Sequence, residues 1–171
     1  MDEPIVDVDS GEVRSCQGQG TLRAMAIGSC IVVVLFDPSA RAAVMLHVML
    51  PGKAPASPRG SETNYAEDAL LAGRQLLARA GGSLAAAQVC LVGGADILGD
   101  QGPAIGDMNA ASLRGLLRPW PCRIAAEDVG GTLRRSVEFN VESGRLHRSL
   151  GDGPLELLWR HRGTGDVPVG I

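Results

Sequence analysis

The sequence predicts a single domain of mixed α/β structure in which β-hairpins outnumber βαβ units. Short apolar runs of strand type recur along the chain with turn residues between them, and helical periodicity is clear in two segments. The length of 171 residues suits one domain with a substantial core. A content of 45% hydrophobic and 20% charged residues is typical of soluble globular proteins.

The first part of the chain predicts short strands that lead into an apolar hairpin. Strands are expected over residues 4–8, 12–16 and 21–27. Two apolar runs, 31–36 and 44–50, then flank the sequence Asp37-Pro38-Ser39-Ala40. This is turn chemistry, because the aspartate side chain caps the turn and the proline ring presets φ.

The hairpin brings a cysteine and a histidine together. If Asp37 faces Ala40 across the turn, Cys30 lies directly opposite His47 on the same sheet face, with Cβ atoms roughly 5 Å apart. A loop one residue longer would place the two side chains on opposite faces. A thiol beside an imidazole is the minimal unit of cysteine nucleophile catalysis, so the sulfur and the nearer ring nitrogen are expected within about 4–5 Å.

Two helices are expected in the middle of the chain. The first spans residues 65–80, with Asn64 as N-cap and Glu67 at capping-box spacing, and Gly81-Gly82 ends it. The second spans residues 109–117 and ends before Pro119.

The remaining strands are expected at 88–92, 123–128, 134–141 and 145–150. After Leu150 the chain is rich in glycine and proline, apart from the run 155–159. We therefore expect one domain over residues 1–150 and an irregular C-terminal tail over residues 151–171.

Composition and charge exclude several functions. The net charge is −3 without a cluster of basic residues, so neither nucleic acid nor an anionic membrane is an expected partner. No secretory signal and no apolar run of about 20 residues occurs, which predicts a cytoplasmic protein without membrane insertion. The four cysteines form no CxxC pair and the three histidines are scattered, so no metal site and no cofactor are expected. The preference for arginine over lysine indicates a bacterial genome.

Each candidate residue has a structural alternative. A cysteine in an apolar strand is usually a small core residue, which is how we interpret Cys90 and Cys122. Cys30 differs because Gly28-Ser29 interrupts the strand before it, where local amides can donate to an oxyanion. His47 on an apolar strand can be a core histidine. With a cysteine expected opposite it, a catalytic histidine is an equal alternative.

Five motifs in order resemble the CheD family of chemoreceptor glutamine deamidases. The resemblance rests on Ile27-Gly28-Ser29-Cys30 and, seventeen residues after the cysteine, on His47-Val48-Met49-Leu50-Pro51. Further matches are Tyr65, Gly93-Gly94-Ala95, Ile105-Gly106 with Asn109, and Ala126-Glu127-Asp128-Val129-Gly130-Gly131. Together these motifs cover about residues 4–150.

The resemblance implies a fold and an activity. The fold is a single α/β sandwich with a mixed, largely antiparallel sheet. The activity is hydrolysis of glutamine side-chain amides on the cytoplasmic helical bundle of methyl-accepting chemotaxis receptors. Cys30 would be the nucleophile and His47 the base, with Gly28 and Ser29 as backbone support for the oxyanion. A CheC-type phosphatase is a further expected partner, and no cofactor is needed.

Three departures from the family pattern leave a second function open. The family threonine six residues before the cysteine is Ala24 here, and Thr21 points to the other strand face. Asp96 and Glu67 stand where asparagine and aspartate are expected. The chain is therefore either an active Cys–His amidase or a weakly active or inactive module that binds a chemoreceptor or phosphatase.

Overall fold

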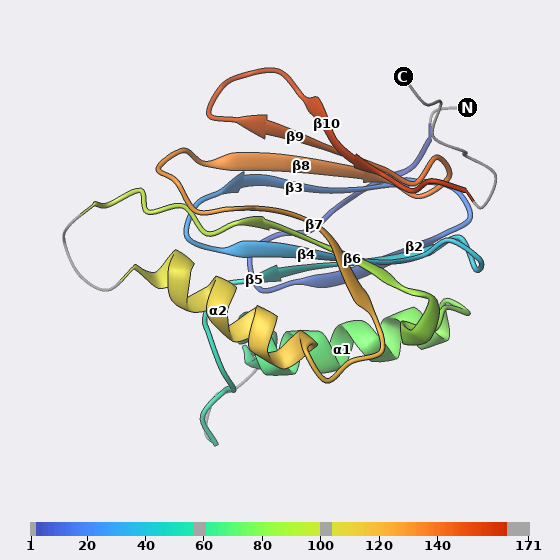
Figure 1. The fold of residues 1–171 in the computed structure, drawn as a ribbon, viewed down its shortest axis with the longest axis horizontal. Helices are drawn as coiled ribbons and strands as arrows, with labels where there is room; N and C mark the ends of the chain where they lie inside the picture. Colours follow the sequence, from blue (N-terminus) through green and yellow to red (C-terminus); the bar gives the residue numbers. More distant parts are fainter. Residues whose placement is uncertain (1–2, 57–60, 100–103, 164–171) are drawn as a thin grey trace, which may run out of the picture.

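The computed structural model describes residues 3–56, 61–99 and 104–163, which form two stacked β-sheets with helices on one outer face (Figure 1). Each sheet has five strands, and most neighbouring strands are antiparallel. The expected α/β sandwich with hairpins is confirmed.

The first sheet has the order β1-β3-β8-β9-β10. Its strands are β1 (Ile5–Asp7), β3 (Thr21–Ile27), β8 (Arg135–Asn140), β9 (Arg145–Leu150) and β10 (Glu156–Arg160). The second sheet has the order β2-β5-β4-β6-β7. Its strands are β2 (Val13–Gln17), β5 (Ala42–Val48), β4 (Ile31–Asp37), β6 (Gln88–Gly93) and β7 (Arg123–Val129).

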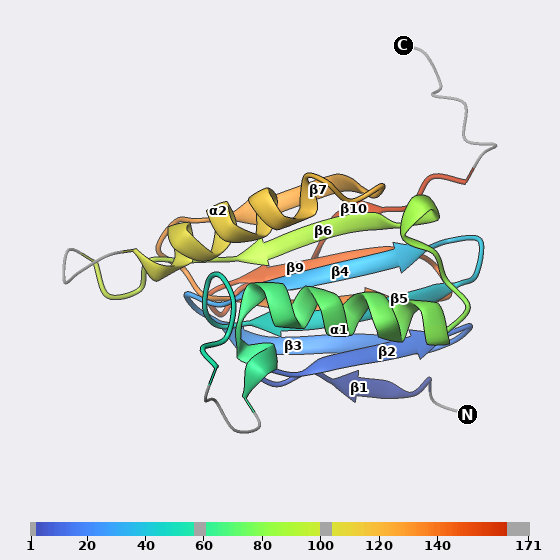
Figure 2. The same ribbon diagram turned by 90° about the horizontal axis from the view of Figure 1, so that it is seen from below.

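Two helices cover the outer face of the second sheet, as the view from below shows (Figure 2). Helix α1 (Ala66–Arg79) packs against β5 and β2, and helix α2 (Ile105–Leu117) packs against β4 and α1. Short 3₁₀ turns, η1 (Glu62–Asn64) and η2 (Leu84–Ala86), precede α1 and β6. Strand β4 is buried along its whole length because it lies between the other sheet and the helices.

The core has two layers that alternate along β4. Ile31, Val33 and Leu35 pack toward the helices, whereas Val32, Val34 and Phe36 pack between the two sheets. This alternation follows from the period of two in a strand, and burial on both faces explains the continuous apolar sequence.

The N-cap of α1 differs from the expectation. Asn64 lies in η1 and does not cap the helix; Tyr65 is the N-cap residue and makes no side-chain capping bond. The carbonyl of Asn64 instead accepts hydrogen bonds from the amides of Met49 and Leu50, which ties the residue to the end of β5. Helix α2 begins one turn earlier than expected, at Ile105.

The C-terminal segment contains a strand. Strand β10 corresponds to the apolar run at 155–159 and pairs antiparallel with β9, with an irregularity between Leu157 and Trp159. Residues 151–163 thus include an edge strand of the first sheet, and residues 164–171 lie outside the described part of the chain.

The register of the β4–β5 hairpin corrects the expectation for Cys30 and His47. Asp37 pairs with Ala42 rather than Ala40, so the loop holds four residues, two more than expected. His47 is therefore opposite Val32, and Cys30 is not directly opposite His47. An even slip preserves the face, so Cys30 and His47 remain on the same side of the sheet, diagonal to one another.

Candidate functional site

Cys30 and His47 lie on the face of the second sheet that packs against the first sheet. Cys30 immediately precedes β4 and packs against the core between the sheets, and His47 shares its face with Met45. In an antiparallel pair, the backbones of diagonal neighbours lie about 7–8 Å apart across the sheet, and a histidine side chain can span this distance. The hairpin therefore brings the two expected residues to one place, and their direct contact stays a prediction.

A β-bulge near the end of β3 positions the segment that contains Cys30. Strand β3 pairs with β8 up to Ala24, and the register shifts before Ile27. Ala26 takes a left-handed φ of 53°, and its amide donates to the Ser136 hydroxyl at 3.1 Å. Bulges re-aim a strand, and here the bulge directs the chain into Gly28-Ser29-Cys30.

The imidazole of His47 is held in one tautomer. Its Nδ1 lies 3.0 Å from the carbonyl oxygen of Val8. A carbonyl only accepts, so Nδ1 carries the proton and Nε2 has a free lone pair. The backbone of His47 is fixed as well, because its amide donates to Glu12 and its carbonyl accepts from Gly11.

Burial sets the charge of His47, whose exposed fraction is 3%. Burial lowers the pKa of its imidazole, while the hydrogen bond to Val8 and the charge of Asp9 partly oppose that change. The ring is consequently neutral at neutral pH, and Nε2 can accept a proton.

The thiol of Cys30 is also shielded. Burial raises the pKa of the Cys30 thiol, and contacts with the Ser10 side chain and with the residue's own backbone amide lower it in part. The free protein therefore holds a protonated thiol at neutral pH, which needs a base to react. Cys90 is buried more deeply, and burial raises its pKa to about 12.

The end of β6 fixes the backbone around Cys30. The Gly94 amide donates to the Cys30 carbonyl at 2.7 Å, and the Ala95 amide donates to the Gly28 carbonyl at 2.9 Å. Gly93 has a φ of 128°, and a Cβ there would lie 2.3 Å from the Cys30 carbonyl oxygen. Only glycine permits this approach.

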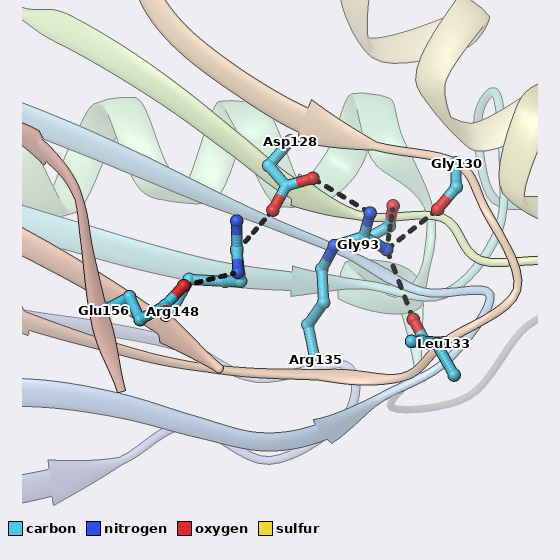
Figure 3. Close-up of polar contacts among 7 residues, drawn as sticks. All are labelled: Gly93, Asp128, Gly130, Leu133, Arg135, Arg148 and Glu156. Atoms are coloured by element: carbon cyan, nitrogen blue, oxygen red, sulfur yellow. Dashed lines mark hydrogen bonds and ion pairs between the residues drawn. The ribbon is translucent and has the colours of Figure 1, made fainter. Parts of the chain in front are cut away.

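A buried arginine from the first sheet holds the same segment (Figure 3). Arg135 is 5% exposed, and its Nη1 donates to the carbonyls of Gly130 at 2.9 Å, Leu133 at 3.3 Å and Gly93 at 3.5 Å. Its Nη2 donates to Asp128 Oδ1 at 2.9 Å. Glu127, the neighbouring carboxylate, pairs with Arg114 instead, as expected for residues on opposite strand faces.

A pocket of about 560 Å³ opens in front of Cys30. Its lining is mostly backbone and apolar side chains from the segments 28–30, 95–99 and 105–106. Ile97 and Leu98 lie at its edge and are exposed. Cys30 belongs to the lining of this pocket, whereas the buried His47 does not.

Neither a metal-ligand cluster nor a membrane-spanning helix occurs in the described residues. The structure places no three His, Cys, Asp or Glu side chains together over residues 3–56, 61–99 and 104–163. None of the helices in these ranges is both long and apolar enough to cross a bilayer.

The fold and the site together define a class of protein. It is a two-sheet α/β protein in which a partly buried cysteine lies at a pocket and a neutral histidine lies on the neighbouring strand. The comparisons give the family. A family model described as "CheD chemotactic sensory transduction" matches residues 49–149. The chain belongs to the CheD family.

Curated relatives match over most of their length. The chemoreceptor glutamine deamidase CheD of Thermotoga maritima is 31% identical, over 84% of this chain and 90% of its own. The protein of that name from Halalkalibacterium halodurans is 31% identical over 90% of this chain and 98% of its own. A probable chemoreceptor glutamine deamidase CheD from Geobacillus kaustophilus is 34% identical over 82% of this chain and 89% of its own.

Sequence reasoning missed the residues that hold the site. Val8 and Ser10 belong to the turn between β1 and β2. Periodicity in a sequence predicts strands and helices, but it does not predict that a turn will fold over another strand. Asn109 was recognised only as a family match without a role, and Arg135 shares the strand alternation of the apolar Leu133 and Val137. A buried polar side chain must be hydrogen-bonded, which directs attention to its partners.

Proposed function

We propose that the chain hydrolyses glutamine side-chain amides on methyl-accepting chemotaxis receptors to glutamate and ammonia. The observation that carries the proposal is the His47 Nδ1 contact with the Val8 carbonyl, which leaves Nε2 free on the strand beside Cys30. The Thermotoga and Halalkalibacterium relatives are named as chemoreceptor glutamine deamidases, which supports the same activity and substrate.

In the first half-reaction, the Cys30 sulfur attacks the glutamine carbonyl carbon while His47 Nε2 takes the thiol proton. Backbone amides at Gly28, Ser29 and Cys30 are the candidate donors to the oxyanion. Collapse of the tetrahedral intermediate breaks the C–N bond, and His47 returns its proton to the departing ammonia. Cys30 then carries a glutamyl thioester.

In the second half-reaction, His47 Nε2 takes a proton from water, and the hydroxide formed attacks the thioester carbonyl. The C–S bond breaks, the proton returns to sulfur, and glutamate leaves. The sum is one amide and one water converted to one carboxylate and one ammonium ion, because the carboxylic acid formed gives its proton to ammonia at neutral pH. A neutral imidazole and a protonated thiol are the protonation states this cycle starts from, and both follow from burial.

The proposed substrate is a surface glutamine on the cytoplasmic helical bundle of a receptor, which places the protein in the cytoplasm. The apolar side chains of Ile97 and Leu98 beside the pocket suit contact with a partner's surface. A CheC-type phosphatase is a second proposed partner.

A weakly active or inactive binding module is the second candidate function. The observation that favours it is Ala24, which is 1% exposed in the layer between the sheets and has no hydroxyl to offer the site.

Ammonia release and receptor mass spectrometry test the proposal, with native protein, Cys30→Ala and His47→Gln on one purified receptor. We expect the native protein to convert glutamine to glutamate, a gain of about one mass unit, and both variants to lose at least 10²-fold in rate. Cys90→Ala, another buried cysteine, is the matched control and should retain deamidation in its folded form.

Native protein that binds receptor but matches Cys30→Ala in rate would establish the binding module and exclude the amidase. In that case Ala24→Thr decides whether the hydroxyl is the missing part, because restored deamidation would identify a lapsed enzyme. If the native protein is already clearly faster than Cys30→Ala, that hydroxyl is dispensable here.

A further inference from the structure

A single amide side chain from α2 joins the two strand ends that carry Cys30 and His47. Asn109 is completely buried, and its Nδ2 donates to the carbonyl of Ser29 and to the carbonyl of Met49, both at 3.0 Å. Ser29 immediately precedes Cys30, and Met49 follows β5 two residues after His47. The helix therefore fixes the spacing of the two strands at the site.

The orientation of this side chain is determined by its partners. Both protons of the Asn109 Nδ2 are directed at carbonyl oxygens, whereas Oδ1 is buried and has no partner among the described residues. A reversed amide would place Oδ1 against two carbonyl oxygens and leave both without a donor. Asn109 thus acts as a donor toward the site.

The contact with Ser29 has a consequence for the next peptide group. A trans peptide is planar, so its N–H points opposite to its carbonyl. With the Ser29 carbonyl held toward α2, the Cys30 N–H is directed away from α2, and it contacts the Cys30 sulfur. The peptide on the other side of Cys30 is held by the Gly94 amide at 2.7 Å.

We propose that Asn109 is a positioning residue that holds the Ser29–Cys30 peptide so that the Cys30 N–H donates to the oxyanion of the amide under attack. This inference rests on the proposed deamidase function. A nucleophile's own amide is well placed for this role because the oxyanion forms on the carbon that the nucleophile attacks.

A residue that only stabilises the fold would behave differently from a residue that orients an oxyanion donor. Attack on a glutamine amide builds an oxyanion, whereas alkylation by iodoacetamide displaces iodide at a saturated carbon and builds none. Loss of the Asn109 contact should therefore slow deamidation and leave the alkylation of Cys30 near its native rate. General loosening of the site would change both rates.

The experiment compares native protein with Asn109→Ala, Asn109→Ser and Asn109→Asp. Deamidation kcat and KM are measured on one receptor, iodoacetamide labelling of Cys30 is followed by mass spectrometry, and thermal unfolding verifies folding. Loss of an oxyanion donor lowers kcat by about 10²–10³-fold, so we expect a fall of about 10–10²-fold for a donor that is misoriented but present. KM and the labelling rate should stay within about twofold of native.

Asn109→Asp separates packing from hydrogen bonding, because it keeps the volume and removes the amide donor. We expect it to deamidate no faster than Asn109→Ala. Asn140→Ala is the matched control, since Asn140 also ties segments together, donating to Glu3 and Thr21, at the opposite end of β3. It should keep native deamidation.

Three results would overturn the inference: native kcat in a folded Asn109 variant, full activity in Asn109→Asp, or a parallel loss of deamidation and labelling. Asn109→Ser removes less volume than Asn109→Ala and repeats the comparison if that variant does not fold. If native protein matches Cys30→Ala, the proposed function itself fails, and the role of Asn109 fails with it. A defect confined to the Asn109 variants leaves the proposed function standing.

Discussion

Burial raises the pKa of the Cys30 thiol, and the Ser10 side chain is the strongest contact that acts against the rise. Ser10 sits two residues after Val8, whose carbonyl fixes the His47 ring, so one turn touches both candidate catalytic residues. A hydroxyl from this turn thus contacts the Cys30 thiol.

Ser10→Ala removes this contact, so the Cys30 pKa should rise further and the thiolate fraction at pH 8 should fall. A hydrogen bond at a partly exposed site contributes up to about 1 kcal/mol, which corresponds to about fivefold in rate. We expect iodoacetamide labelling of Cys30 at pH 8 to slow by up to about that factor, measured by mass spectrometry. Ser39→Ala, an exposed turn serine at the other end of the hairpin, is the control.

Equal labelling rates in the Ser10 and Ser39 variants would contradict this role for Ser10. A rate that stops rising below pH 8 in native protein would contradict the shielded thiol itself, because a thiol with a raised pKa gains thiolate through pH 9.

At the scale of elements, the turn end of the β4–β5 hairpin contributes to stability, whereas the other end carries the candidate site. The buried carboxylate of Asp37 accepts from the amides of Ser39 and Ala40 through Oδ1 and from Ser83 through Oδ2, the last at 2.8 Å. These bonds join the turn to the segment after α1. The site lies at the other end of β4, a distance of about 20 Å for seven residues.

Asp37→Ala leaves three backbone amides without their acceptor in a site that is 3% exposed. We expect the free energy of unfolding to fall by about 1–3 kcal/mol, measured by urea denaturation. Cys30 labelling per folded molecule should remain native, because the site end of the hairpin is held by Gly93, Gly94 and Asn109. A labelling rate that follows the loss of stability would show that the turn controls the site.

Much of this architecture is predictable from the sequence at the level of elements. Strands β3 and β9 begin and end where the alternation and the turn residues indicate, and α1 differs by one residue at each end. The hairpin register was wrong because Asp37-Pro38 indicates a turn but does not determine whether its loop has two or four residues. Cys30 and His47 still share a sheet face, because the observed register differs from the expected one by an even number of residues.

The support of the site was not predictable in the same way. Asn109 and Arg135 act on backbone carbonyls that come from other elements, and a carbonyl has no sequence signature. The departure at Ala24 could be recognised, but the contacts of Val8 with His47 and of Ser10 with Cys30 depend on how the turn between β1 and β2 folds over β5.

At the scale of the whole molecule, one charged cluster joins the two sheets beside the site (Figure 3). Asp128 on β7 of the second sheet forms ion pairs with Arg135 on β8 and Arg148 on β9, both of the first sheet. Arg148 also reaches Glu156 on β10 at 3.8 Å. Most other contact between the sheets is apolar, so this cluster is a charged part of the sheet interface that should respond to pH.

Protonation of Asp128 should weaken the ion pairs that join the two sheets. Burial acts to raise the pKa of its carboxyl, but the hydrogen bond and charge of Arg135 and the charge of Arg148 outweigh burial, so the pKa lies below its ordinary value of 3.8. A carboxyl with a depressed folded pKa contributes stability that is present above the unfolded pKa and is lost as pH falls through the folded pKa. The contribution is therefore complete at pH 7 and begins to be lost below about pH 4.

Asp128→Asn removes the carboxylate that pairs with the largely buried guanidinium groups of Arg135 and Arg148, at an expected cost of about 1–3 kcal/mol at pH 7. The difference between native and variant, measured by urea denaturation, should shrink as the pH is lowered from 5 to 3, because Asp128 of the unfolded chain then takes up a proton that the folded carboxylate resists. Glu142→Gln is the control, since its pair with Arg41 is exposed on both sides and should contribute little at any pH. A native–variant difference that stays constant down to pH 3 would show that Asp128 contributes through its shape rather than its charge, and the cluster would then be no pH-sensitive joint.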